Sequence, residues 1–281
     1  MRCAWRGRVR LDTIPRMSGL ADEGFLSDET TGIVEAVERR YGPWLAIFRS
    51  VNARAVKAQY ETQIPREYLP ALVAAVCYMR TLTNIEAAVL LMLRGMDAPA
   101  RIMLRASLES LFKLKAVEQD RNVVNAILAG DDVFRKKLLE KYQRIDDPKL
   151  KAELERIGPL KSETAEKFKE WGVTTLSVEQ MAAKAEMTTV YLSTYPVLSD
   201  PVHAGIRDLE RHVEIDNGEI VALRNEPKID GLEILFLMAT EFLISALEGF
   251  ASVLQFDLGE FCNDSKRTVK ALADRTPERL K

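Results

Sequence analysis

Both histidines of the 281-residue chain lie in one short stretch, SDPVHAGIRDLERHV. An imidazole changes its charge near neutral pH, so His203 and His212 are the side chains best suited to acid–base chemistry. His203 also ends a series, Tyr195, Ser199 and His203, whose members are four positions apart. On a helix this spacing places a phenol, a hydroxyl and an imidazole on one side. Two prolines within the series interrupt the hydrogen bonds of a continuous helix and weaken that geometry.

A second polar series, Arg101, Arg105 and Glu109, recurs every four residues on an earlier apolar segment. Arginine and glutamate at this spacing form salt bridges on helix surfaces, which is one interpretation. The other is a buried cluster, because a guanidinium inside a helical bundle needs several hydrogen-bond acceptors. The later phenol, hydroxyl and imidazole supply such acceptors. We therefore expect the two series to form one polar cluster, which either fixes the helix register or binds a small polar ligand.

Two spaced patterns carry a resemblance to a known family: R-x-x-L-R-x-x-x-E, ending at Glu109, and Y-x-x-x-S-x-x-x-H, ending at His203. A strand-like segment and an apolar helix follow them. Over roughly residues 65–255 this arrangement resembles the bacterial family catalogued as domain of unknown function 5677. The resemblance implies an all-helical cytosolic domain without an agreed activity. The site or polar-core positions that it implies are Arg105, Glu109, Ser199 and His203.

Arg207 and His212 form a further motif, in which a polar residue and three spacers separate the arginine from the histidine. This motif resembles that of the HEPN superfamily, whose ribonuclease members are helical bundles that pair two such motifs across a dimer. The resemblance implies an alternative function, a metal-independent ribonuclease that acts as a toxin or phage-defence effector. An imidazole can move a proton from a 2′-hydroxyl, and a guanidinium can hold a phosphate. Glu210 and Glu214 would repel that phosphate unless they are neutralised.

Other common kinds of active site are missing from the sequence. Cys3, Cys77 and Cys262 are far apart and form no C-x-x-C pair, which argues against a disulfide scaffold and a four-ligand zinc site. No ExxH or HExxH spacing, phosphate-binding glycine loop or G-x-S-x-G element occurs. We therefore predict no metal site and no cofactor. The net charge of -2 provides no general basic field for nucleic acid.

Apolar residues recur with helical periodicity along most of the chain, which predicts an all-α helical bundle of about seven to nine helices. The main helices are expected near 30–60, 66–94, 98–119, 177–196 and 230–256. Pro43 predicts a kink in the first of them. Asp97 and Ser177 are expected to cap the helices that follow them. Asn217–Gly218, between alternating apolar and polar residues, predicts one small β-hairpin insertion over 213–223.

The predicted organisation is a single helical domain over residues 17–260. Residues 1–16 are basic and lack the apolar run of a signal peptide, so we expect a disordered tail. Residues 121–170 are more charged and are predicted to form a peripheral helical segment. Residues 261–281 are polar and are expected to form a C-terminal helix or tail. The sparse cysteines and the lack of an export signal favour a cytoplasmic protein.

The apolar segment 230–256 is long enough to raise the question of a membrane span. Three glutamates recur there at intervals of eight and seven residues, Glu233, Glu241 and Glu248, and predict one face of the helix in contact with water. This pattern favours a core helix of a bundle over a membrane span. The wide apolar faces of the longest helices favour a large core or a dimer interface. We therefore expect a homodimer without membrane association, and nucleic acid as a partner only under the ribonuclease alternative.

Overall fold

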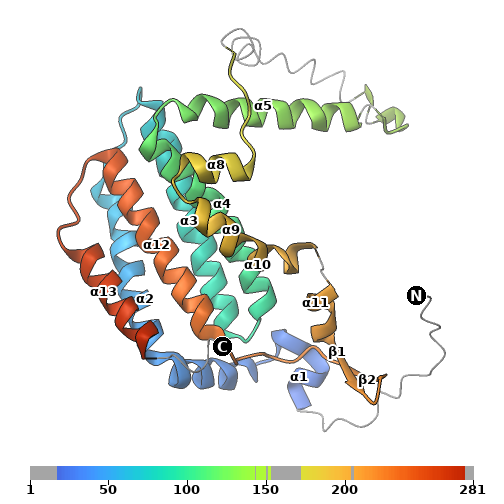
Figure 1. Cartoon of the computed structure of the whole chain (residues 1–281). Helices are drawn as coiled ribbons and strands as arrows, with labels where there is room; N and C mark the ends of the chain where they lie inside the picture. Colours follow the sequence, from blue (N-terminus) through green and yellow to red (C-terminus); the bar gives the residue numbers. More distant parts are fainter. Residues whose placement is uncertain (1–17, 143, 150, 153–171, 204–205, 276–281) are drawn as a thin grey trace.

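A computed structural model of the chain describes residues 18–142, 144–149, 151–152, 172–203 and 206–275 (Figure 1). The disordered tail predicted for residues 1–16 lies outside these ranges, as do the last residues of the predicted C-terminal segment. Within them the chain is mostly helical and carries one two-stranded antiparallel hairpin. The predicted all-α class with one hairpin insertion is therefore confirmed.

The core of the molecule is formed by long helices that pack lengthwise against one another (Figure 1). They are α2 (Thr30–Glu61), α3 (Leu69–Leu93), α4 (Asp97–Gln119) and α12 (Leu232–Leu254). Helix α12 contacts the other three, and apolar residues all round it are buried. A helix whose surface is mostly apolar is stable inside a core, and α12, with three glutamates among its apolar residues, is the centre around which the bundle is built.

Shorter elements surround this core. They are α1 (Ser18–Glu23), η1 (Gly24–Leu26), α5 (Val123–Tyr142), α8 (Val178–Lys184), α9 (Thr188–Ser193), α10 (Tyr195–Ser199), η2 (Pro201–His203), α11 (Ile206–Leu209), η3 (Glu210–His212) and α13 (Phe261–Asp274). Helix α5 projects from one end of the bundle, and the hairpin lies beside α11 at the other end (Figure 1). Helix α5 is the first part of the charged segment 121–170, and the peripheral position of that segment stays a prediction, since residues 153–171 lie outside the described ranges.

The prediction of a single helix over 177–196 is wrong, because the chain forms the three short helices α8, α9 and α10 there. Glu186 has a φ of 57°, and this left-handed backbone conformation ends α8. Pro196 lies in the first turn of α10, where a missing N–H costs nothing, and so starts a new helix. The capping prediction for Ser177 is confirmed, since Ser177 and Gln180 form a reciprocal capping box at the start of α8.

Helix α2 has a kink near Pro43, as the sequence predicts. Tyr41 has φ −113° and ψ 18°, which are not helical values, two residues before Pro43. Proline lacks the N–H of the helix ladder and its ring crowds the preceding turn. The Tyr41 hydroxyl donates a hydrogen bond to the carbonyl of Ile229, 2.6 Å away, and so ties the kink to the start of α12.

The predicted hairpin is confirmed, with strands β1 (Val213–Asp216) and β2 (Glu219–Leu223). Asn217 and Gly218 have φ of 49° and 81°, the positive values that a tight two-residue turn requires. The chain then returns toward α12 past the α3–α4 junction, where the Lys228 N–H donates to the carbonyl of Gly95 over 2.8 Å. This contact brings the segment after the hairpin against the start of α4.

Two helices in the described ranges, α3 and α12, are long and apolar enough to cross a membrane, judged by length and composition. Their most apolar windows have mean hydropathies of 1.3 and 1.7. In α12, 67% of that window is buried in the molecule, so its composition is that of a core helix. In α3 the share is 44%, and apolar side chains such as Val76 and Leu90 face outward.

Candidate ligand-binding site

Two polar clusters involve α4, one near the middle of the helix and one at its first turns. The first joins α4 to α10 and contains Arg105, Glu109 and Tyr195, which we call the α4–α10 cluster. An Arg105 Nη donates to the Tyr195 hydroxyl over 2.8 Å, and that hydroxyl donates to Glu109 Oε1 over 2.7 Å. Arg105 and Glu109 are also an ion pair at 3.2 Å. The structure therefore brings together the arginine, the carboxylate and the phenol that the sequence singled out.

The α4–α10 cluster is partly buried, and most of its polar groups bond to one another. The Arg105 guanidinium also lies over the Tyr195 ring, 5.0 Å from its centre. Burial and the hydrogen bond with Glu109 raise the pKa of Tyr195, whereas Arg105 acts in the opposite direction. The phenol therefore stays protonated and can donate to the carboxylate. Arg105 Nε is buried without a hydrogen bond to any described residue, but the bonds that the cluster does make run between α4 and α10 and hold the two helices together.

The other predicted members of the cluster lie elsewhere. Ser199 Oγ donates to the Tyr195 carbonyl, one turn earlier in the same helix, over 2.7 Å. After α10 the chain turns into η2, because Pro201 breaks the helix ladder. The His203 side chain is exposed and forms no hydrogen bond with any described residue. Arg101 points toward Asp97 and belongs to the second cluster.

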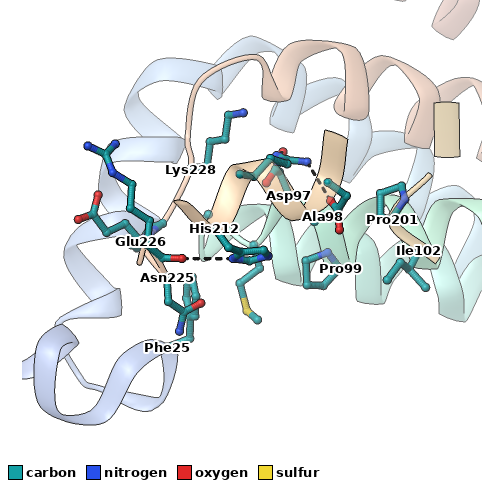
Figure 2. A pocket seen from close by; sticks show the side chains of 16 residues that line it. Phe25, Asp97, Ala98, Pro99, Ile102, Pro201, His212, Asn225, Glu226 and Lys228 are labelled. Carbon is teal, nitrogen blue, oxygen red and sulfur yellow. Dashed lines mark hydrogen bonds and ion pairs between the residues drawn. The ribbon is translucent and has the colours of Figure 1, made fainter. Parts of the chain in front are cut away.

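A pocket of about 710 Å³ lies where the start of α4 meets η3 and the segment after β2 (Figure 2). We call it the hairpin pocket. Its walls include Met96, Pro99 and Ile102 around the first turns of α4, and residues 224–228 after the hairpin. Its volume lies within the range of about 300–1,000 Å³ that is usual for small-molecule sites.

One side of the hairpin pocket carries two carboxylates that are almost fully buried. Asp97 is 7% exposed and Asp208 is 9% exposed. Arg211 lies between them, with one Nη bonded to Asp97 Oδ2 and the other 3.6 Å from Asp208 Oδ1. Arg101 approaches Asp97 Oδ2 with its Nε at 3.8 Å. We call these four residues the floor cluster. Burial lowers the pKa of Arg101, and Asp97 acts in the opposite direction.

The floor cluster corrects the capping prediction for Asp97. Met96 is the residue that precedes α4, and no side chain caps this end of the helix. Asp97 is instead the first helical residue, where its charge is favoured by the helix dipole while its carboxylate pairs with Arg211. The charged hydrogen bond from Arg211, with the Arg101 guanidinium nearby, engages this carboxylate in place of the backbone N–H groups.

Two atoms of the floor cluster lack hydrogen bonds. Asp208 Oδ1 and Arg101 Nε are shielded from water, and neither has a hydrogen-bond partner among the residues that the structure describes. A buried polar group without a partner costs about 1–3 kcal/mol. Such groups are rare in folded proteins, and a bound molecule or water is a frequent reason for them. Of the two residues, Asp208 lines the pocket and Arg101 does not, so one unbonded oxygen belongs to the pocket wall.

His212 also lines the hairpin pocket. Its Nδ1 lies 3.2 Å from the carbonyl oxygen of Arg224. A carbonyl only accepts hydrogen bonds, so Nδ1 carries the proton and Nε2 of the neutral ring is left as an acceptor. Figure 2 shows the ring lying across the pocket between Asn225 and Pro99. The pocket thus contains an exposed imidazole with one nitrogen uncommitted.

Sequence reasoning missed the floor cluster because its partners are far apart in the chain. Asp97 and Arg211 are separated by 114 positions, and no local pattern links them. A usable signal was the aspartate at the first turn of α4, which sequence reasoning assigned to capping alone. The Arg207 side chain, part of the ribonuclease motif, lies outside the described part of the structure.

No group of three or more His, Cys, Asp or Glu side chains in the described ranges is arranged to hold a metal ion. Cys77 and Cys262 are buried and unpaired. Burial raises the pKa of both thiols, to about 11 for Cys262. Neither cysteine is therefore a reactive thiolate at neutral pH.

The profile of a family described as "Family of unknown function (DUF5677)" matches residues 71–220, more than half of the chain. The chain belongs to this family. The match begins in α3, includes α4 and α10, and ends in the hairpin, so the DUF5677 region contains both polar clusters. No curated protein and no solved structure matches the chain. None of these comparisons supports the HEPN resemblance.

Proposed function

We propose that this DUF5677 protein binds a small molecule in the hairpin pocket. The observation that carries the proposal is the incompletely bonded floor: the nearly buried Asp208 lines a pocket of about 710 Å³, and its Oδ1 lacks a hydrogen bond with any described residue. Pockets that combine apolar walls with a few polar groups are the usual form of a small-molecule site. The apolar walls here come from the first turns of α4.

The α4–α10 cluster has a structural role in this proposal. Its phenol, guanidinium and carboxylate bond to one another and hold α10 on α4. The chain continues from α10 through η2 to α11 and η3, which carry Asp208 and His212. The cluster therefore positions one wall of the pocket, while the floor cluster and His212 contact the ligand.

The test compares compounds retained by the full chain with those retained by a variant whose pocket is filled. The chain is incubated with the small-molecule fraction of a bacterial extract and washed, and the released compounds are identified by mass spectrometry. Ala98 lines the pocket, so Ala98→Trp should abolish retention. Leu192 is 64% exposed on α9, so Leu192→Trp is the matched control and should retain the same compounds. Equal retention by the Ala98 variant would refute the proposal.

A second candidate function, a metal-independent ribonuclease, is favoured by one observation. His212 lies in a pocket with Nε2 free to accept a proton, as a general base requires. The nearby carboxylates of Asp97 and Asp208 oppose it, because they occupy the Arg211 guanidinium that would otherwise attract a phosphate. Expression should then arrest growth, and the purified chain should cleave RNA in the presence of EDTA. His212→Ala should abolish both effects and His203→Ala neither; a chain without either activity removes this candidate.

A further inference from the structure

Helix α5 carries a stripe of apolar side chains on the part that projects from the bundle. Its first turn is anchored in the core by Val124, whereas the rest of the helix points away from the other helices (Figure 1). Phe134, Leu138 and Tyr142 are four positions apart and so lie on one face. Phe134 is 62% exposed and Tyr142 is also exposed. The N–H of the exposed Ile145 donates to the Tyr142 carbonyl over 3.0 Å, which keeps Ile145 at the end of the row. We call Phe134, Leu138, Tyr142 and Ile145 the α5 stripe.

Basic side chains flank the α5 stripe on both sides. At 3.6 residues per turn, Arg135 lies on one side of the stripe, and Lys137 and Lys141 lie on the other. Both lysines are exposed, and neither forms an ion pair with any residue that the structure describes. Their ammonium groups are therefore available to an anionic partner that covers the stripe.

The carboxylates of this region leave the flanks positively charged. Residues 135–145 contain five basic residues and one glutamate, Glu140, which lies on the face opposite the stripe. The other carboxylates nearby precede or follow these residues and are Asp131, Asp132, Asp146 and Asp147. Asp131 is paired with Arg135 at 2.7 Å, and Asp146 with Lys151 at 2.7 Å. A partner on the stripe thus meets an excess of positive charge.

An apolar stripe between basic flanks matches the surface of an anionic lipid bilayer. Helices that lie in the plane of a membrane bury such a stripe at the edge of the acyl chains, while lysine and arginine reach the phosphates. A nucleic acid would engage the basic flanks but leave Phe134 and Leu138 uncovered. The α5 helix of a second copy would set like charges against each other. Charge and apolar surface together therefore favour the bilayer.

We propose that the projecting part of α5 binds the surface of an anionic lipid bilayer and lies in its plane with the α5 stripe facing the acyl chains. The sequence-based expectation of no membrane association was argued against a span in the α12 segment, and a helix that lies on the surface needs no span. The proposal is independent of the hairpin pocket, which lies at the other end of the bundle (Figure 1).

The test measures flotation of the full-length protein with two kinds of vesicle, phosphatidylcholine alone and an equal mixture of phosphatidylcholine and phosphatidylglycerol. The protein should float with the mixed vesicles only, and less of it as the salt concentration rises. Phe134→Ser should weaken binding roughly tenfold or more, the loss expected when one large apolar side chain is no longer buried. Leu192 is 64% exposed on α9, so Leu192→Ser is the matched control and should bind like the parent protein.

Lys137→Glu tests the charge of the flanks. It should weaken binding roughly tenfold, because it replaces an attracted charge by a repelled one. Lys270 is exposed on α13, so Lys270→Glu makes the same change away from α5 and should leave binding unaltered. Phe134 and Lys137 are both exposed, so their variants should fold, which circular dichroism checks.

Equal binding to the two kinds of vesicle, or binding to neither, would overturn the proposal. Binding of Phe134→Ser as tight as that of the parent protein would overturn it as well. The same protein is also titrated with single-stranded RNA. Binding of RNA that Lys137→Glu loses and Phe134→Ser keeps, without flotation of the parent protein, would assign the basic flanks to nucleic acid and refute the bilayer.

Discussion

Tyr195 shows how a single hydroxyl links two helices. It accepts a hydrogen bond from Arg105 and donates one to Glu109, which a phenol can do at the same time. The i,i+4 pair of Arg105 and Glu109 alone would be a weakly stabilising contact on the face of α4. The phenol converts it into a contact between α4 and α10.

Replacing Tyr195 by phenylalanine should lower the free energy of unfolding by about 1–2 kcal/mol, because two hydrogen bonds to charged groups are lost while the ring remains. Urea denaturation followed by circular dichroism measures this change. Tyr60 is 81% exposed, so Tyr60→Phe is the control and should have no measurable effect. An unchanged stability of the Tyr195 variant would show that the α4–α10 cluster does not hold the two helices together.

Glu241 makes the stability of the protein depend on pH. Burial raises the pKa of this carboxyl group above 4.5, Lys266 lowers it and Glu248 raises it. A raised pKa in the folded state means that folding favours the protonated form. The contribution is thus fully present below about pH 4.5 and is lost as the pH rises through the folded pKa.

The variant Glu241→Gln should therefore raise the melting temperature near neutral pH and change it little at about pH 4. Melting temperatures of the variant and the parent protein across this interval measure the effect. Glu67→Gln, in the exposed loop before α3, is the control and should follow the parent protein at every pH. A Glu241 variant less stable than the parent near neutral pH would mean that the attraction to Lys266 outweighs the cost of burial.

At the scale of the elements, the α3–α4 junction fixes one wall of the hairpin pocket. Gly95 has a φ of 73°, a left-handed conformation that glycine adopts without strain. A Cβ at this position would lie 2.7 Å from Pro227 Cβ. The glycine therefore allows the segment after the hairpin to pack directly on the junction.

Gly95→Ala should lower the free energy of unfolding by about 1–3 kcal/mol, because it adds both backbone strain and a steric clash. Gly130 lies inside α5 with no atom near the site of a Cβ, so Gly130→Ala should instead stabilise the protein by about 0.5–1 kcal/mol. Guanidinium denaturation of the two variants measures the contrast. Similar effects of both changes would show that the segment after the hairpin moves away from Gly95 without cost.

At the scale of the whole molecule, α3 leaves apolar side chains in contact with water. Leu72, Val76 and Leu90 are 46%, 60% and 64% exposed. Exposed apolar side chains gathered on one helix are more often found at interfaces than on the free surface of a monomer. The homodimer expected from the sequence stays a prediction, and α3 offers a surface on which to test it.

Light scattering at micromolar concentration should give twice the chain mass of 31.7 kDa. Val76→Glu should shift the protein toward the monomer, because it places a charge among the apolar residues of α3. Leu192→Glu makes the same kind of change on α9, where the side chain is also exposed, and should leave the mass unaltered. A monomer mass for the parent protein at this concentration would refute the dimer.

The features that the sequence by itself determined are those that depend on near neighbours. Ser177 and Gln180 are three positions apart and form their capping box, and the adjacent Asn217 and Gly218 form the hairpin turn. The kink before Pro43 has the same local origin. Such residues interact whatever the rest of the chain does, so these elements were predictable. The partnership of Arg105 and Tyr195 was predictable on other grounds, since an arginine between helices requires acceptors.

Tertiary structure alone decided which distant residues meet at the hairpin pocket. Arg211 reaches Asp97 across 114 positions because η3 returns to the start of α4, and Gly95 lets the segment after the hairpin close the wall. His203 was expected beside Arg105, yet the turn at Pro201 leaves it in water. A charged side chain pairs with the partner that the packed helices bring within reach, and this depends on the path of the whole chain. Sequence spacing predicts the faces of single helices, whereas packing selects the contacts between them.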